Sequence, residues 1–207
     1  MNLIKRPFHY RYDNVVLYII GINILVFLLQ QFFPYLTTYL ALNPVLVYRG
    51  WVWQFVSYMF AHGGISHLVF NMLALFIFGT QVERQIGSKE FLLYYVLTGI
   101  LAGVFSFVVY WVTGAYGVFL LGASGALFAV QLAYAVFFPN AVVYIWGILP
   151  LRAPVMVLAF TALEVFFSVT GFRAGVAHLT HLAGFAFGWV YFLARFGTNP
   201  WKALTRR

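Results

Sequence analysis

The chain has 207 residues, of which 64% are hydrophobic and only 8% are charged, and its mean hydropathy is +0.92. A water-soluble domain carries about 25% charged residues, so this composition excludes an ordinary soluble protein and predicts one compact integral membrane domain. The absence of cysteine excludes disulfides and thiol chemistry. A net charge of +8 would suit a nucleic-acid partner, but the basic residues form no groove-filling patch, so we expect no nucleic acid to bind.

Six apolar stretches predict six transmembrane helices, at residues 14–33, 65–80, 91–113, 124–138, 153–170 and 176–196. A full span takes about 20 residues, so the second and fourth helices are expected to be short and to leave room for water above them. The expected organisation is a tail at residues 1–13, a membrane domain at 14–197 and a basic tail at 198–207. The first stretch reads as a retained helix, because no signal-peptide cleavage motif follows it.

The connections between the stretches predict the orientation in the membrane. Of the twelve Lys and Arg residues, only Arg49 and Arg173 fall outside the two tails and the second and fourth loops. The positive-inside rule therefore puts both termini in the cytoplasm. The compact six-span form suggests a bacterial inner membrane.

Three of the connections have features of their own. The connection at residues 34–61 is rich in Tyr and Trp, and we expect it to be a partly helical element at the outer membrane interface. The charged residues 81–90 predict a helix stop and a turn. The segment at residues 139–151 is apolar but broken by two prolines, so it is expected to lie along the cytoplasmic surface.

Polar residues occur at one depth on three of the predicted helices. With this orientation the second, fourth and sixth helices all begin at the outer face. His67 and Asn71 lie in the first two turns of the second helix, Ser124 opens the fourth, and His181 lies about two turns into the sixth. Polar side chains are costly in hydrocarbon, so this cluster in the outer third of the membrane is a candidate functional site.

Small residues predict that the fourth and sixth helices pack closely. His181 shares one helix face with Gly184 and Gly188, whose spacing is typical of close helix approach, and the partner face would be the small residues 122–126. Such packing would bring the His181 ring to the Ser124 hydroxyl, and a neutral histidine can activate a serine as nucleophile. The Ser124 amide and the side chains of His67 and Asn71 could bind the oxyanion.

At these residues the sequence resembles the rhomboid family of intramembrane serine proteases, over residues 53–189. Three blocks carry the resemblance, at residues 53–71, 122–125 and 181–188. It implies an all-α, six-helix bundle in which Ser124 and His181 form a catalytic dyad without a third acid. It further implies oxyanion donors from His67, Asn71 and the Ser124 amide, support of the loop above the site by His62, and substrates that are transmembrane helices of single-span proteins in the lipid bilayer.

Two residues depart from the family pattern. Gln54 stands where the family commonly has arginine, which leaves open how the outer connection is anchored. Phe128 replaces a common tyrosine but keeps the aromatic ring, so it should still stack on His181. With Gly122, Gly184 and Gly188, Phe128 is expected to support the site.

Several alternatives remain. His178 lies three residues before His181 and could also be the base, but the glycines that follow His181 favour the latter. No H-E-x-x-H motif is present, so we expect no metal and no cofactor. Glu164, the one carboxylate predicted within the membrane, could line the site or bond locally within the bundle. The competing functions are a catalytically silent rhomboid-like protein that binds membrane clients, disfavoured by the complete Ser/His/Asn set, and a transporter, disfavoured by the absence of repeated half-spans.

Overall fold

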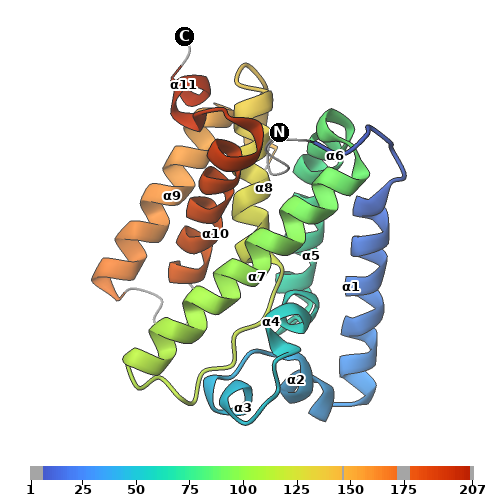
Figure 1. Ribbon diagram of the computed structural model, residues 1–207, viewed down its shortest axis with the longest axis vertical. Helices are drawn as coiled ribbons and strands as arrows, with labels where there is room; N and C mark the ends of the chain where they lie inside the picture. The colour runs from blue at the N-terminus through green and yellow to red at the C-terminus, as the bar shows by residue number, and fades with distance from the viewer. Residues whose placement is uncertain (1–6, 146, 172–177, 206–207) are drawn as a thin grey trace.

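The computed structural model describes residues 7–145, 147–171 and 178–205. Figure 1 shows a bundle of helices in which α1 (Val15–Phe32) and α9 (Ala153–Thr170) stand at opposite edges and α7 (Ser88–Val112) slants across the front. Behind α7 lie α5 (Ile65–Ala74) and α8 (Ser124–Phe137), and α10 (His178–Tyr191) stands between α9 and α8. The segment that leads into α1 and the short helix α11 (Pro200–Leu204) lie at one end of the bundle.

Four helices in the described part of the chain are long and apolar enough to cross a membrane: Val15–Phe32, Ile65–Ile86, Ser88–Val112 and Ala153–Thr170. As predicted, α8 is short, with 14 residues. Helix α10 also has 14 described residues and continues as a π-helical turn, η4 (Phe192–Phe196). Its predicted start at residue 176 lies outside the described residues. The helical membrane fold is thus confirmed, while the count of six spans stays a prediction.

The prediction of a short second helix is wrong. Helix α5 continues through a π-helical turn, η3 (Leu75–Gly79), into α6 (Thr80–Ile86), which gives a continuous helix of 22 residues. The charged residues 81–90, predicted to form a helix stop and a turn, belong mostly to α6 and to the start of α7. The turn between them is confined to Gly87, whose φ of 84° is favourable for glycine.

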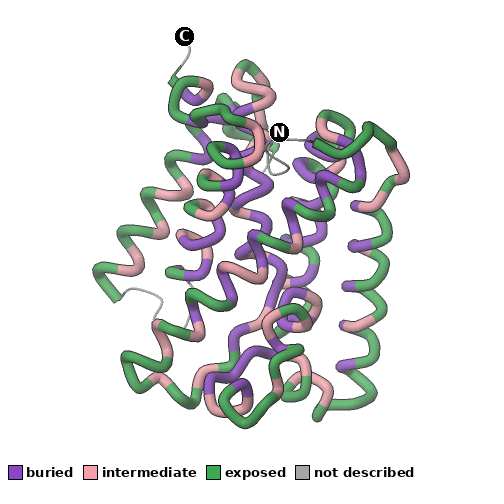
Figure 2. The backbone as a smooth tube through the Cα atoms, viewed as in Figure 1, coloured by how far each residue is buried: buried purple, intermediate pink, exposed green. Residues whose placement is uncertain are grey.

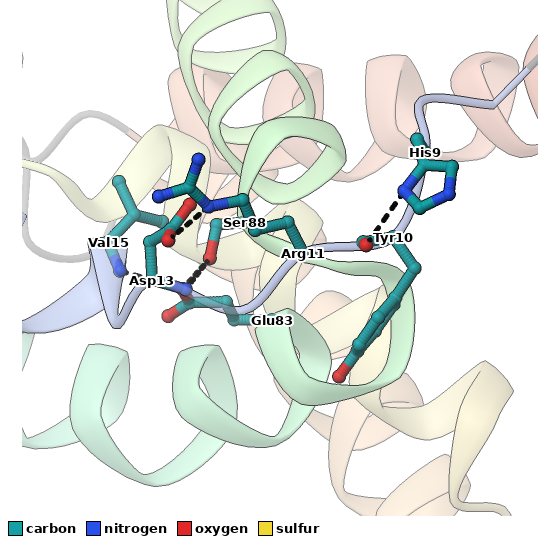
Figure 3. A network of polar contacts seen from close by, with 7 residues as sticks. All are labelled: His9, Tyr10, Arg11, Asp13, Val15, Glu83 and Ser88. Carbon is teal, nitrogen blue, oxygen red and sulfur yellow. Dashed lines mark hydrogen bonds and ion pairs between the residues drawn. The ribbon is translucent and has the colours of Figure 1, made fainter.

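Buried carboxylates explain why these charged residues can be helical. Glu83 accepts hydrogen bonds from the backbone amides of Val15 and Val16, at 2.6 and 3.0 Å, and from the Ser88 hydroxyl, so it caps the start of α1 (Figure 3). Glu90 pairs with the Arg195 guanidinium at 2.7 and 2.8 Å and accepts a hydrogen bond from the Tyr191 hydroxyl. These carboxylates therefore bind neighbouring segments together at the end of the bundle.

The segment between α8 and α9 forms a β-hairpin, which the all-α prediction did not include. Strands β1 (Val142–Ile145) and β2 (Leu149–Arg152) pair antiparallel, with Tyr144 opposite Pro150. The β-branched and aromatic residues of β1 favour a strand, and Pro150 is tolerated because a two-stranded hairpin has free edges.

The long connection after α1 is partly helical, as expected. It contains α2 (Tyr35–Leu40), α3 (Pro44–Tyr48), α4 (Gln54–Ser57) and a 3₁₀ turn, η2 (Tyr58–Phe60). The side chain of Gln54 is fully buried. Its side-chain oxygen accepts a hydrogen bond from the backbone amide of Asn43 at 3.0 Å, and its side-chain nitrogen donates to the Thr38 and Tyr39 carbonyls. A neutral glutamine thus anchors the connection at the position where arginine is common.

Burial is concentrated in the inner helices of the bundle (Figure 2). Ten of the 14 residues of α8 are buried, many of them alanine, which lets its neighbours approach closely. By contrast, only 22% of the α9 span is buried within the protein. The bundle therefore places the start of α8 in a protein interior, with α9 at the edge.

Candidate active site

Ser124 and His181 meet where α8 packs on α10. The Oγ of Ser124, the first residue of α8, lies 2.7 Å from Nε2 of His181, and both residues are half-buried. The contact requires close helix packing, because a Cβ added to Gly184 would lie 1.8 Å from the Gly125 carbonyl oxygen. Gly188 faces Ala129 in the same seam, where an added Cβ would lie 3.0 Å from the alanine Cβ. The expected close approach of these two helices is present.

The ring of Phe128 fixes the orientation of the His181 ring. Phe128 lies one turn after Ser124 on α8, and its ring is stacked on that of His181 with centroids 4.7 Å apart and an interplanar angle of 7°. The predicted stacking is therefore present without the tyrosine hydroxyl. It holds the imidazole at the angle from which Nε2 reaches Ser124.

A cavity of about 530 Å³ opens in front of the pair. His67 and Asn71 line it from α5, together with Gln131 from α8. The Asn71 amide nitrogen donates to the His67 carbonyl at 2.9 Å, which leaves its second hydrogen for another acceptor. Gln131 is not among the site residues predicted from the sequence, although it lies seven residues after Ser124 and so shares its helix face.

Gly122 makes room for the His67 ring beside the serine. Its φ is +112°, a conformation that favours glycine, and an added Cβ would lie 2.7 Å from Cε1 and Nε2 of His67. Its amide donates to the Tyr58 carbonyl at 2.9 Å, which fixes the chain just before α8. His67 is thereby held within the same cavity as Ser124.

His62 is buried next to His67, and its expected role in supporting the loop above the site stays a prediction. Its ring centroid lies 5.0 Å from that of His67. Gln30 of α1 binds its backbone from both sides, accepting from the His62 amide at 3.0 Å and donating to its carbonyl at 3.3 Å. Burial lowers the pKa of His62 to about 4, so the ring stays neutral near pH 7. Gln30 was also missed; a glutamine in an apolar span was the available signal.

Glu164 reaches the site from α9 and contacts both histidines of α10. Its Oε2 lies 2.6 Å from Nδ1 of His178, and its Oε1 lies 3.1 Å from Nδ1 of His181. The second contact is an ion-pair distance without hydrogen-bond alignment. The two rings have centroids 6.5 Å apart, and His181 is the one beside Ser124. Glu164 thus lines the site, which the sequence left open.

The same three residues are the donor set that could hold a metal. Their ligand atoms lie within 4.8 Å of one another, and two imidazoles with a carboxylate suit Zn²⁺. Nδ1 of His178 and Nδ1 of His181 are, however, already directly beside the carboxylate oxygens. An ion held by this donor set would replace these direct contacts.

Fold and site together define a helical membrane protein with a serine–histidine pair that faces a cavity within the bundle. Residues 49–197 match the family model of the Rhomboid domain, which is well over half of the chain. The chain therefore belongs to the rhomboid family.

Named relatives include several proteases. Rhomboid protease GluP of Bacillus subtilis (strain 168) is 43% identical over 90 residues, which are 42% of this chain and 18% of that protein. Putative rhomboid protease YdcA of the same organism is 29% identical over 146 residues, 70% of this chain and 67% of that protein. Rhomboid protease AarA of Providencia stuartii is 27% identical over 151 residues, 66% of this chain and 53% of that protein. The chain thus matches less than a fifth of GluP and about half of AarA.

Proposed function

We propose that this chain is an intramembrane serine endopeptidase that cleaves the transmembrane segments of single-span membrane proteins. The observation that carries the proposal is the 2.7 Å contact between Ser124 Oγ and His181 Nε2 beside a cavity within the bundle. The protease names of its relatives support the same activity. The pairing of Ser124 with His181 also disfavours a silent client-binding protein, which would need no activated serine.

The geometry supports a two-step acyl transfer. His181 Nε2 takes the proton of Ser124 as Oγ attacks the scissile carbonyl carbon, and the carbonyl oxygen becomes an oxyanion. In the proposed mechanism the Ser124 amide, the Asn71 side-chain amide and the His67 ring donate hydrogen bonds to it; all three residues line the cavity, which supports this role. His181 then protonates the leaving amine. Water then attacks the acyl carbon and gives a proton to His181, which returns it to Ser124 Oγ as the carboxyl product leaves.

The proposed setting is a six-span protein of the bacterial inner membrane with both termini in the cytoplasm. Its domain would extend over residues 14–197, and the site would lie in the outer third of the bilayer. The end of the bundle that carries α2 to α4 would then face outward (Figure 1). A substrate helix must unwind to expose its scissile carbonyl, because helical carbonyls are hydrogen-bonded, so segments with small or helix-breaking residues are the expected substrates.

The direct test is cleavage by the purified full chain in lipid vesicles, against a panel of single-span proteins. Ser124→Ala is expected to lower the cleavage rate by at least about 10³-fold, because the nucleophile is lost. Ser66→Ala removes a hydroxyl from an exposed position on α5 and should cleave like the parent. Equal cleavage by Ser124→Ala and the parent would refute the proposed function.

A further inference from the structure

Glu164 is a carboxylate in the middle of an apolar helix, and the two-residue mechanism above does not use it. A carboxylate in hydrocarbon is costly unless it is paired. Here both of its oxygens contact imidazole nitrogens, at 2.6 Å from His178 and 3.1 Å from His181. The side chain is about 15% exposed and so is held within the bundle. The acid is therefore placed against the ring that contacts the serine.

The contact bears on which nitrogen of His181 carries its proton. For Nε2 to accept the Ser124 proton, the neutral ring must carry its hydrogen on Nδ1. The group facing Nδ1 is the negative Oε1 of Glu164, which attracts a proton on that nitrogen even without ideal alignment. The opposite tautomer would direct a lone pair at the carboxylate and leave Nε2 unable to act as base.

His178 contacts the other oxygen of the same carboxylate. Its Nδ1 donates to Oε2 of Glu164 at 2.6 Å, so it holds the carboxylate through the oxygen that does not contact His181. The side chain of His178 is only 9% exposed, and its ring does not contact Ser124. His178 therefore fixes the carboxylate and does not take part in the proton transfer.

We propose that Glu164 is a positioning residue that sets the tautomer of His181 and stabilises the imidazolium formed when Ser124 gives up its proton, with His178 holding Glu164 in place. The proposal rests on the proposed protease function. In place of the expected dyad without an acid, it assigns a triad of Ser124, His181 and Glu164, which come from the three helices α8, α10 and α9. The route of the proton is the same as in the two-residue mechanism: it moves from Ser124 Oγ to His181 Nε2 and then to the leaving amine. Glu164 remains a carboxylate throughout.

Kinetics of Glu164 variants test the proposal in vesicles. Glu164→Gln keeps the shape but loses the charge, and it is expected to lower kcat by at least ten-fold, on the order of 10²-fold, with KM changed less than two-fold. Glu164→Asp should recover part of this loss. Thr161→Val is the matched control, because Thr161 lies one turn away on α9 and its hydroxyl bonds, within the described residues, to the Val157 carbonyl of its own helix. A parent-like kcat in Glu164→Gln would overturn the proposal.

A spectroscopic measurement separates this proposal from the protease function. The measurement needs no activity and uses ¹⁵N-histidine-labelled Ser124→Ala protein. NMR is expected to show the His181 proton on Nδ1, and adding the Glu164→Gln substitution should weaken or remove that signal. If the parent cleaves no substrate, the protease function fails while the NMR result still decides the positioning role. A His181 proton found on Nε2 would contradict it. Activity should also survive a chelator, since loss on chelation would assign the three residues to a metal.

Discussion

Replacing His181 by alanine is expected to reduce cleavage by at least about 10³-fold, whereas His178→Ala should retain at least a tenth of the parent rate. General-base catalysis contributes about 10²–10⁴-fold, and Nε2 of His181 lies 2.7 Å from the Ser124 hydroxyl, where it can act as that base. His178 instead bonds Glu164, so its loss loosens the carboxylate without removing the base. The measurement is the initial rate of cleavage of one substrate in vesicles by each purified variant.

The two histidine variants control for each other, because each removes one imidazole from the same helix and both imidazoles contact Glu164. A general loss of folding would lower both rates together, and thermal unfolding of each variant would reveal it. The opposite order, with His178→Ala inert and His181→Ala active, would transfer the role of base to His178.

Gly184→Ala is expected to have the largest effect on stability, a loss of more than about 3 kcal/mol in the free energy of unfolding. The added Cβ would lie 1.8 Å from the Gly125 carbonyl oxygen, which belongs to helix backbone and cannot move aside alone. Helices α8 and α10 would have to separate, and His181 would move away from Ser124. Unfolding by denaturing detergent in mixed micelles measures the difference, and activity should be lost with it.

Gly21→Ala is the matched control for Gly184→Ala. Gly21 lies in α1 and has nothing within 4 Å of an added Cβ. Alanine there should leave stability unchanged or raise it by about 0.5–1 kcal/mol through helix propensity. A Gly184→Ala protein as stable as Gly21→Ala would mean that the helices are not in close contact at this seam.

The sequence predicted the centre of the bundle well because its signals were local and redundant. Gly184 and Gly188 sit on the same helix face as His181, and this spacing correctly predicted close packing against the start of α8. The stacking of Phe128 on His181 could be expected from the resemblance to the rhomboid family, because Phe128 keeps the aromatic ring at that position. Motifs at fixed helical spacing carry three-dimensional information by themselves.

The sequence failed where long-range pairing decides the structure. Glu83 and Glu90 looked like loop residues because nothing local shows that Val15, Val16 and Arg195 will satisfy their charge. The hairpin of β1 and β2 arises from pairing across a turn in an apolar, proline-broken segment that was expected only to lie along the membrane surface. Glu164 was recognised as unusual, but its contact with His181 depends on where α9 packs, which no spacing within one helix reveals.

The most direct test of the central claim is the site of reaction with a fluorophosphonate, a reagent that phosphonylates activated serines. Peptide mass spectrometry of the labelled full chain is expected to find the adduct on Ser124 in the parent and to find it lost in His181→Ala. Adduct on another residue, or labelling of Ser124 that persists without His181, would contradict an active site built on this pair.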